Sequence, residues 1–208
     1  MLSVRDLVPL LSYMWLKGHC RACKKRISLQ YPIVEFATAA MFVAVLFLRW
    51  GNPILILIDW VIMSALIALY VFDLQYGLLP DTLTLPAIGF VIIERLMLGV
   101  SVQDVVLDML FGAVIGGVFF GAQWVISKGK WIGDGDIRLG VLMGILLGFP
   151  GVLLALMISY AIGSMVSIAL VVSKIKHWNS RIALGPFLVI GTVVVYYWQD
   201  ALLVWLGF

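Results

Sequence analysis

Charged side chains are scarce in this sequence. Lysine, arginine, aspartate and glutamate make up 12% of the 208 residues, whereas 63% are apolar. A soluble domain has about 25% charged and about 45–50% apolar residues. Together with a mean hydropathy of +1.12, this excludes a soluble domain and predicts an all-α membrane protein with several spans. We expect membrane lipid around it and no nucleic-acid partner.

Seven segments are apolar enough to enter the bilayer, where a span needs about 20 residues, with a range of about 17–25. They are residues 33–50, 53–72, 83–100, 105–126, 139–149, 152–172 and 183–208. The fifth has only 11 residues before Pro150 and Gly151. We interpret it as a short span, with one arm of a helical hairpin as the alternative. The prediction is about seven transmembrane helices within residues 33–208, after a basic cytosolic segment over residues 1–32.

Basic residues are few and lie on one side of the predicted membrane. Twelve of the 14 fall in the N-terminal tail and in the loops after the fourth and sixth segments: Arg5, Lys17, Arg21, Lys24, Lys25, Arg26, Lys128, Lys130, Arg138, Lys174, Lys176 and Arg181. Positively charged loops stay in the cytoplasm. We therefore expect the N-terminus and residues 73–82, 133–136 and 173–182 to face the cytoplasm.

Acidic residues number only 11, and two of them belong to the tetrad Gly133, Asp134, Gly135 and Asp136. On insertion scales a carboxylate at the centre of a membrane helix costs roughly 2.5–3.5 kcal/mol. Glycine allows close backbone approach, so it can direct a carboxylate where ordinary helix geometry would not. The tetrad therefore predicts an active site at a membrane face.

Two more carboxylates lie at the same predicted face. Asp73 ends the second segment, where the helix dipole disfavours an anion, so we expect it to be compensated or functional. Asp81 follows Pro80 and precedes an apolar helix, so its side chain is expected to cap that helix.

The remaining polar and small residues of the apolar segments are expected to serve the fold. Asp59 is expected at the membrane interface, and Asp108 is expected to point into the bundle. Adjacent Glu94 and Arg95 are expected to have a structural role, either snorkelling to the membrane interface or pairing with other groups. Close helix packing accounts for the glycines of the fourth segment, which are Gly112, Gly116, Gly117 and Gly121.

Two carboxylates from different helices at one depth fit an aspartyl-protease pair. Such a pair shares one proton because like charges a few ångströms apart cannot both ionise. One carboxylate acts as a base on water while the other polarises the peptide carbonyl. At this point a cation or proton pathway fits equally well, since intramembrane carboxylates also mark transporters.

Four motifs resemble those of type IV prepilin peptidases and occur in the order of that family. They are the G-x-G-D tetrad, the run over residues 79–86 after Asp73, the cysteine-containing stretch over residues 18–28 and 31–35, and residues 184–187. The resemblance implies an aspartic endopeptidase of the bacterial inner membrane. It would cut the basic leader of prepilins or pseudopilins, the subunits of type IV pili and type II secretion, at the cytoplasmic face. Asp73 and Asp136 would be its catalytic residues.

The resemblance also implies substrate contacts and a second activity. Asp81, Asp134, Gly133 and Gly135 are expected to line the substrate site, where the carboxylates would form an acidic patch for the basic leader. Many family members methylate the new N-terminal amine with S-adenosylmethionine. The resemblance associates that activity with the cysteine region and with Glu35.

Cysteine occurs only twice, as Cys20 and Cys23, whereas the family typically has two C-x-x-C pairs and an additional N-terminal span. These two residues are the candidate zinc ligands, but a structural zinc needs four ligands and one pair supplies half the set. Either the first span and first pair are missing from this chain, or the zinc site has been lost. Methyl transfer is in question for the same reason, and an inactive remnant is a third hypothesis.

Overall fold

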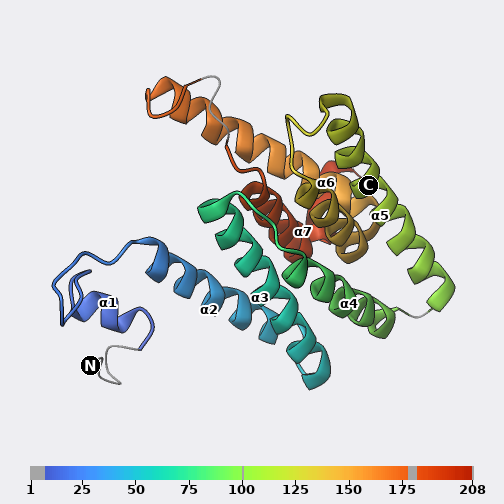
Figure 1. Ribbon diagram of the computed structural model, residues 1–208. Coiled ribbons are helices and arrows are strands. Elements are labelled where there is room, and N and C mark those ends of the chain that lie inside the picture. Colours follow the sequence, from blue (N-terminus) through green and yellow to red (C-terminus); the bar gives the residue numbers. More distant parts are fainter. Residues whose placement is uncertain (1–7, 100, 178–181, 208) are drawn as a thin grey trace. The chain divides into compact units, whose positions relative to one another are not determined.

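All seven secondary-structure elements of the described part of the chain are helices, which confirms the predicted fold class (Figure 1). The computed structural model describes residues 8–99, 101–177 and 182–207. Arg5, Arg181 and the predicted segment ends at positions 100 and 208 lie outside them. The helices are α1 (Leu11–Trp15), α2 (Gln30–Leu48), α3 (Pro53–Tyr76), α4 (Asp81–Leu98), α5 (Val102–Ser127), α6 (Asp134–Val172) and α7 (Gly185–Leu206).

Five of these helices, α2, α3, α5, α6 and α7, are long and apolar enough to cross a membrane. The prediction of a polytopic membrane protein is therefore confirmed. The 18-residue α4 lies outside this set and carries Asp81, Glu94 and Arg95. Because α6 contains both the fifth and the sixth predicted segments, the number of seven crossings stays a prediction.

The 39 residues of α6 are interrupted in the middle. Gly148 and Phe149 have non-helical φ and ψ angles, and Pro150 follows them. Asp108 of α5 lies at this break, where its Oδ1 accepts a hydrogen bond of 2.9 Å from the backbone N–H of Phe149. Its other oxygen pairs with Arg95 of α4. The predicted inward orientation of Asp108 is confirmed, and pairing is the one of the two expected structural roles that Arg95 shows.

The break reverses the direction of the chain. Asp108, near the start of α5, contacts the break in α6. Further along α5, Gly116 contacts Gly140, which precedes the break. Gln123, near the end of α5, contacts Tyr160, which follows the break. The residues before the break, 134–147, therefore run antiparallel to α5, and the residues after it, 150–172, run parallel to α5. We name them the first arm and the second arm of α6. The hairpin alternative is thus the correct description of these two segments.

The first arm packs against α5 backbone to backbone. A Cβ added at Gly112 would lie 2.0 Å from the carbonyl oxygen of Gly144, and one added at Gly116 would lie 2.0 Å from that of Gly140. Small residues allow this close approach between membrane helices. The packing role predicted for Gly112 and Gly116 is confirmed, whereas Gly121 was assigned wrongly because no atom lies within 4 Å of its added Cβ.

Glu94 shows a second polar contact within the bundle. Its side chain in α4 is 1% exposed, and its Oε1 accepts a hydrogen bond of 3.0 Å from the hydroxyl of Tyr196 in α7. Burial of a carboxylate is expensive unless it is hydrogen-bonded. The contact therefore bears out a structural role for Glu94.

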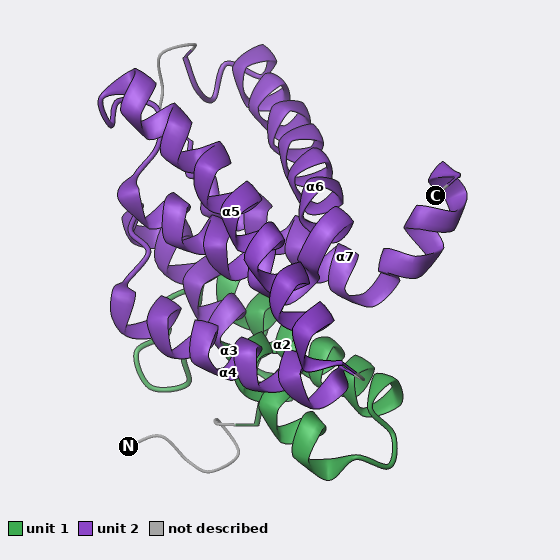
Figure 2. Cartoon of the chain, turned by 90° about the vertical axis from the view of Figure 1, so that its right-hand side faces the viewer, with its two compact units in different colours: residues 1–64 green, residues 65–208 purple. Residues whose placement is uncertain are grey.

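The chain forms two compact units, residues 1–64 and residues 65–208, and the division falls inside α3 (Figure 2). In the first unit the indole N–H of Trp60 donates to the carbonyl of Phe42 at 3.1 Å, and the two rings stack. Asp59, expected at the membrane interface, is buried and accepts a hydrogen bond of 2.7 Å from Arg49. The predicted division after residue 32, which marks where the apolar chain begins, stays a prediction.

Gly116→Ala is expected to lower the thermal unfolding midpoint in detergent, because the new Cβ meets backbone that cannot move aside. Overpacking costs about 1–3 kcal/mol, at roughly 2–4 °C per kcal/mol for a chain of this size. Gly121→Ala on the same helix is the matched control. It should leave the midpoint unchanged or raise it, since alanine stabilises a helix interior relative to glycine. Equal midpoints for the two variants would contradict the backbone contact.

Candidate active site

Asp73 lies in the last turn of α3, and its carboxylate is buried, with the residue 6% exposed. The helix ends at Tyr76 because Gly77 adopts a φ of +63°, which glycine allows. The backbone N–H of Gly77 donates to the Asp73 carbonyl at 2.9 Å. This position at a helix C-terminus places the carboxylate against the negative end of the dipole, as the sequence predicts.

The first turn of α7 compensates Asp73. The backbone N–H of Gly185 lies beside the carboxylate, and a Cβ added at Gly185 would lie 2.5 Å from Oδ2. Oδ2 is nevertheless buried without a hydrogen bond of good geometry among the described residues. Since helix N-termini favour anions, the approach of α7 explains how a buried carboxylate can stand at the end of α3.

Asp136 lies in the first turn of α6 and is 9% exposed. Its Oδ2 accepts a hydrogen bond of 2.9 Å from the backbone N–H of Gly133, and the helix dipole favours a carboxylate here. Gly135 allows the loop before α4 to come close, because a Cβ at this position would lie 2.8 Å from the Cβ of Leu79. The two glycines of the tetrad therefore shape the backbone around Asp136.

Asp73 and Asp136 form one electrostatic pair. They come from the end of α3 and the start of α6, both are buried, and the charge of Asp73 acts on Asp136. Two carboxylates in one buried site cannot both ionise at low cost. The structure thus places within electrostatic range of each other the two residues that the resemblance implies as a pair.

Asp81 and Asp134 share an arginine. The prediction that Asp81 caps α4 is wrong, because Pro80 holds the N-cap position and Asp81, already in the first helical turn, pairs with Arg138 of α6. Arg138 also pairs with Asp134, one helical turn earlier, at 3.2 Å. A single cation therefore offsets part of the acidic patch that the sequence predicts. In the sequence, Arg138 indicates only the membrane orientation and not this contact.

Tyr160 is a neighbour of the pair that the sequence does not indicate. It belongs to the second arm of α6, and its hydroxyl donates to Oε1 of Gln123 at 3.2 Å. Its side chain lies within electrostatic range of Asp136. A lone tyrosine in an apolar helix gives no signal of this kind, because its position depends on the reversal of the chain at Gly148.

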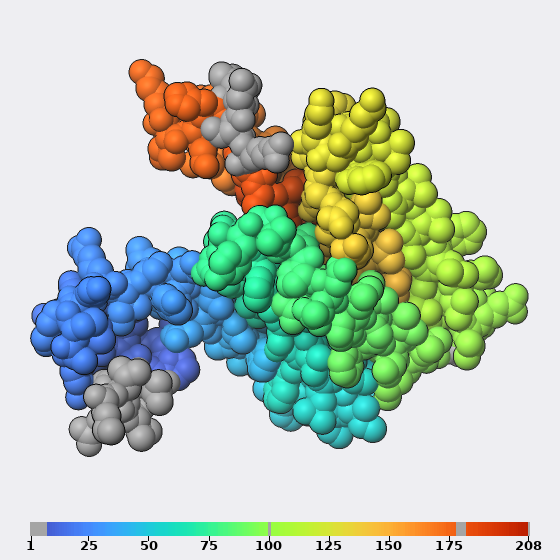
Figure 3. All heavy atoms as spheres, in the orientation of Figure 1, coloured from blue at the N-terminus to red at the C-terminus, as the bar shows by residue number. Residues whose placement is uncertain are grey.

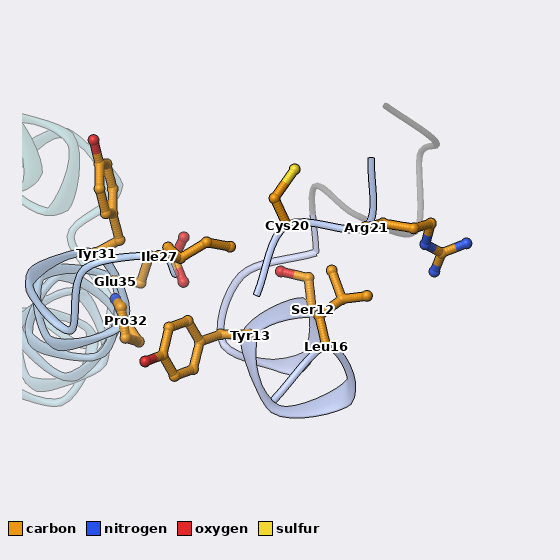
Figure 4. Close-up of a pocket in the computed structure, with 9 residues that line it drawn as sticks. All are labelled: Ser12, Tyr13, Leu16, Cys20, Arg21, Ile27, Tyr31, Pro32 and Glu35. Atoms are coloured by element: carbon orange, nitrogen blue, oxygen red, sulfur yellow. The ribbon is translucent and has the colours of Figure 1, made fainter. Parts of the chain in front are cut away.

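The N-terminal unit holds a separate pocket around Glu35, with a cavity volume of ≈ 170 Å³ (Figure 4). Oε2 of Glu35 accepts a hydrogen bond of 2.7 Å from the backbone N–H of Leu10. The pocket combines this carboxylate with two tyrosines, one cysteine and an arginine. Its lining residues are Ser12, Tyr13, Leu16, Cys20, Arg21, Ile27, Tyr31, Pro32 and Glu35.

The two cysteines lie in a small hairpin beside this pocket. His19 and Arg26 form an isolated bridge, and the backbone N–H of Cys20 donates to the carbonyl of Lys25 at 2.9 Å. Within residues 8–99, 101–177 and 182–207, no three His, Cys, Asp or Glu side chains group as a metal site would require. Cys20 and Cys23 alone do not fit the four-ligand set of a structural zinc, so we derive no role for that ion.

Two family models match the chain. Residues 60–168 match the type IV leader peptidase family, and residues 1–49 match the bacterial peptidase A24 N-terminal domain. The matched ranges include Asp73, Asp136 and Glu35. No solved structure matches the chain.

Three similar proteins each carry the name prepilin leader peptidase/N-methyltransferase. The one from Aeromonas hydrophila is 34% identical over 98% of this chain and 70% of its own length. That of Bacillus subtilis strain 168 is 29% identical over 97% of this chain and 79% of its own length. The protein of Pseudomonas aeruginosa is 31% identical, with 93% and 67% covered.

Gly185→Ala is expected to reduce the peptide hydrolysis predicted for the carboxylate pair, because the new Cβ displaces the Asp73 carboxylate. Misplacing a catalytic group by about 1 Å can lower the rate by roughly a hundredfold. The measurement is the initial rate of peptide cleavage by purified protein. Gly89→Ala is the control, since no atom lies within 4 Å of its added Cβ. Unchanged cleavage by Gly185→Ala would show that the Gly185 contact does not position Asp73.

Proposed function

Because the chain belongs to the type IV leader peptidase family, we propose that Asp73 and Asp136 are the catalytic pair with which it cleaves prepilins. Membership makes it an integral-membrane aspartic endopeptidase. The observation that carries the residue assignment is the burial of both carboxylates, one in the last turn of α3 and one in the first turn of α6, within electrostatic range of each other. Pseudopilins, which present the same kind of leader, belong to the proposed substrate class.

The proposed chemistry uses one water molecule and the single proton that the pair holds. The ionised carboxylate removes a proton from the water, whose oxygen forms a bond to the carbonyl carbon of the scissile peptide. The protonated carboxylate donates to the carbonyl oxygen. The C–N bond then breaks, the nitrogen leaves with a proton as the new N-terminal amine, and the pair regains its starting state. The proton belongs to the pair and not to either residue alone.

We place this reaction at the cytoplasmic face. The basic residues of the N-terminal tail and of the loops after the fourth and sixth predicted segments support that orientation through the positive-inside rule. Asp136 stands at the start of α6, directly after the loop that holds Lys128 and Lys130. Water and a short basic leader reach this boundary from the cytosol, while the apolar helix of the prepilin stays in the bilayer.

The transporter alternative has no support from the comparisons, because both family models and the similar proteins are those of peptidases. The other carboxylates that are buried or turned inward among the described residues also have partners. Asp108 pairs with Arg95, and Glu94 accepts from Tyr196. Asp59 accepts from Arg49. None of these contacts requires an ion pathway.

We further propose that the pocket around Glu35 serves the methyl-transfer activity. S-adenosylmethionine, when bound, supplies a methyl group on a positively charged sulfur. The Glu35 carboxylate would attract that charge, and the rings of Tyr13 and Tyr31 offer faces to a cation. The cavity of ≈ 170 Å³ is smaller than the 300–1,000 Å³ of typical ligand sites. It would therefore hold the part of the donor nearest the sulfur.

Replacing either carboxylate of the pair with its amide, Asp73→Asn or Asp136→Asn, is expected to abolish prepilin cleavage, because an amide can neither hold nor accept the shared proton. Purified protein is incubated with a model prepilin, and the products are read by mass spectrometry. Asp104→Asn, at an exposed position in the first turn of α5, is the matched control. Cleavage that survives in both active-site variants would overturn the assignment of the pair.

Glu35→Gln is expected to abolish methylation while leader cleavage continues, because the pocket loses its charge but the pair stays intact. The same incubation with S-adenosylmethionine detects both products. The converse control is Asp136→Asn supplied with already cleaved pilin, which should still be methylated. Loss of both activities in Glu35→Gln would instead indicate that the N-terminal unit supports the peptidase as a whole.

A further inference from the structure

A hollow of ≈ 210 Å³ lies between the second arm of α6 and the segment leading into α7. Figure 3 shows the second arm, in orange, projecting beyond the red start of α7. One wall carries small polar residues at helical spacing, and the other carries apolar side chains. The lining residues are Tyr160, Gly163, Ser164, Ser167, Ile182, Ala183, Leu184 and Phe187.

Two residues that line this hollow connect it to the carboxylate pair, one by sequence adjacency to Gly185 and one by an electrostatic effect. Tyr160, at one end of it, lies within electrostatic range of Asp136. Leu184, in the opposite wall, directly precedes Gly185, whose backbone contacts Asp73. A substrate segment seated in the hollow would therefore continue directly to the pair.

The position of the hollow along the bundle indicates which part of a substrate it would hold. Tyr160 lies beside Gln123, close to the end of α5 at Ser127, and the second arm runs parallel to α5. From Tyr160 the hollow continues along the second arm toward Lys174, away from the break at Gly148. That direction leads to the side where the basic loops lie. A substrate chain that extends from the carboxylate pair toward this side is the leader, which is the part that precedes the cleaved bond.

The chemistry of the wall fits a peptide backbone. The hydroxyl of Ser164 donates to the carbonyl of Ala161 at 2.9 Å, and that of Ser167 donates to the carbonyl of Gly163 at 2.6 Å. Each oxygen keeps lone pairs that can accept a backbone N–H. Gly163 allows Phe187 to pack closely against the second arm, since a Cβ there would come within 3.3 Å of that ring.

We propose that this hollow is the subsite for the leader residues immediately before the cleaved bond, held by their backbone against Ser164 and Ser167. The inference rests on the proposed peptidase function and deepens it. The lining contains no carboxylate, and Arg138 already pairs with Asp81 and Asp134. Recognition of the leader residues next to the cleaved bond therefore depends on the small size of their side chains and on backbone hydrogen bonds more than on the charge of the leader.

The test is disulfide cross-linking of full-length protein in membranes, with Ser164→Cys in a background of Cys20→Ser, Cys23→Ser and Asp136→Asn so that the substrate stays uncut. Two prepilins are compared, one with a cysteine two residues before the cut and one with a cysteine two residues after it. We expect about tenfold more cross-link to the first, a preference of about 1.4 kcal/mol. Ser64→Cys, an exposed serine on α3, is the matched control and should give neither product.

Two outcomes would overturn the subsite. One is a preference for the cysteine after the cut, which would assign the hollow to the apolar helix of the pilin. The other is the absence of any cross-link to both substrates, with Ser164→Cys and also with Ser167→Cys. Ser167→Cys is the second variant, used in case Ser164→Cys fails to accumulate. Cleavage of the same prepilins by the chain with Asp136 restored tests the proposed function separately. A chain that cleaves but does not cross-link leaves the peptidase assignment intact and removes the subsite.

A kinetic measurement gives an independent readout. Ser164→Leu fills the hollow and is expected to raise KM for prepilin about tenfold with kcat retained, since one side chain in a binding pocket is worth a factor of roughly 10–200. Ser64→Leu should leave both constants unchanged. A fall in kcat with unchanged KM would contradict a role in leader binding.

Discussion

The backbone contact between α5 and the first arm of α6 is the interaction on which the arrangement of the site depends. Gly112 and Gly116 meet Gly144 and Gly140 with no side chain between them, so the first arm is fixed in depth and rotation against its neighbour. Asp136 stands one turn before Gly140. A shift of the first arm would therefore move this carboxylate away from Asp73.

The break in α6 is the second part of the same constraint. The first arm is about 21 Å long at 1.5 Å per residue, whereas the hydrocarbon core is about 30 Å thick. A break in a helix frees backbone polar groups, and away from water each of them needs a partner. Asp108 accepts the N–H of Phe149 and pairs with Arg95. This contact allows the first arm to end inside the bundle and the second arm to return along α5, where Tyr160 meets Gln123.

Much of this arrangement could be predicted from the sequence, because apolar length, basic loops and isolated carboxylates are local signals. They predicted the helical class and the apolar segments, whereas the choice of Asp73 and Asp136 as the pair came from the resemblance of the motifs. The partners of these residues could not be predicted, since they depend on contacts between distant helices. Gly185 was visible only as part of a motif, and the pairing of Asp81 with Arg138 spans 57 positions. The sequence instead predicted that Asp81 caps α4, because capping is a contact between residues that are close in the chain.

The central claim is that Asp73 and Asp136 act as one unit holding one proton, and the pH dependence of kcat/KM for prepilin cleavage tests it most directly. Losing the shared proton and gaining a second one should both stop the reaction. We therefore expect kcat/KM to follow a bell-shaped curve with pH, in which both the rise and the fall are titrations of the carboxylate pair as a whole. A rate that only rises with pH until it levels off would show that one ionised carboxylate is sufficient, and would contradict the account.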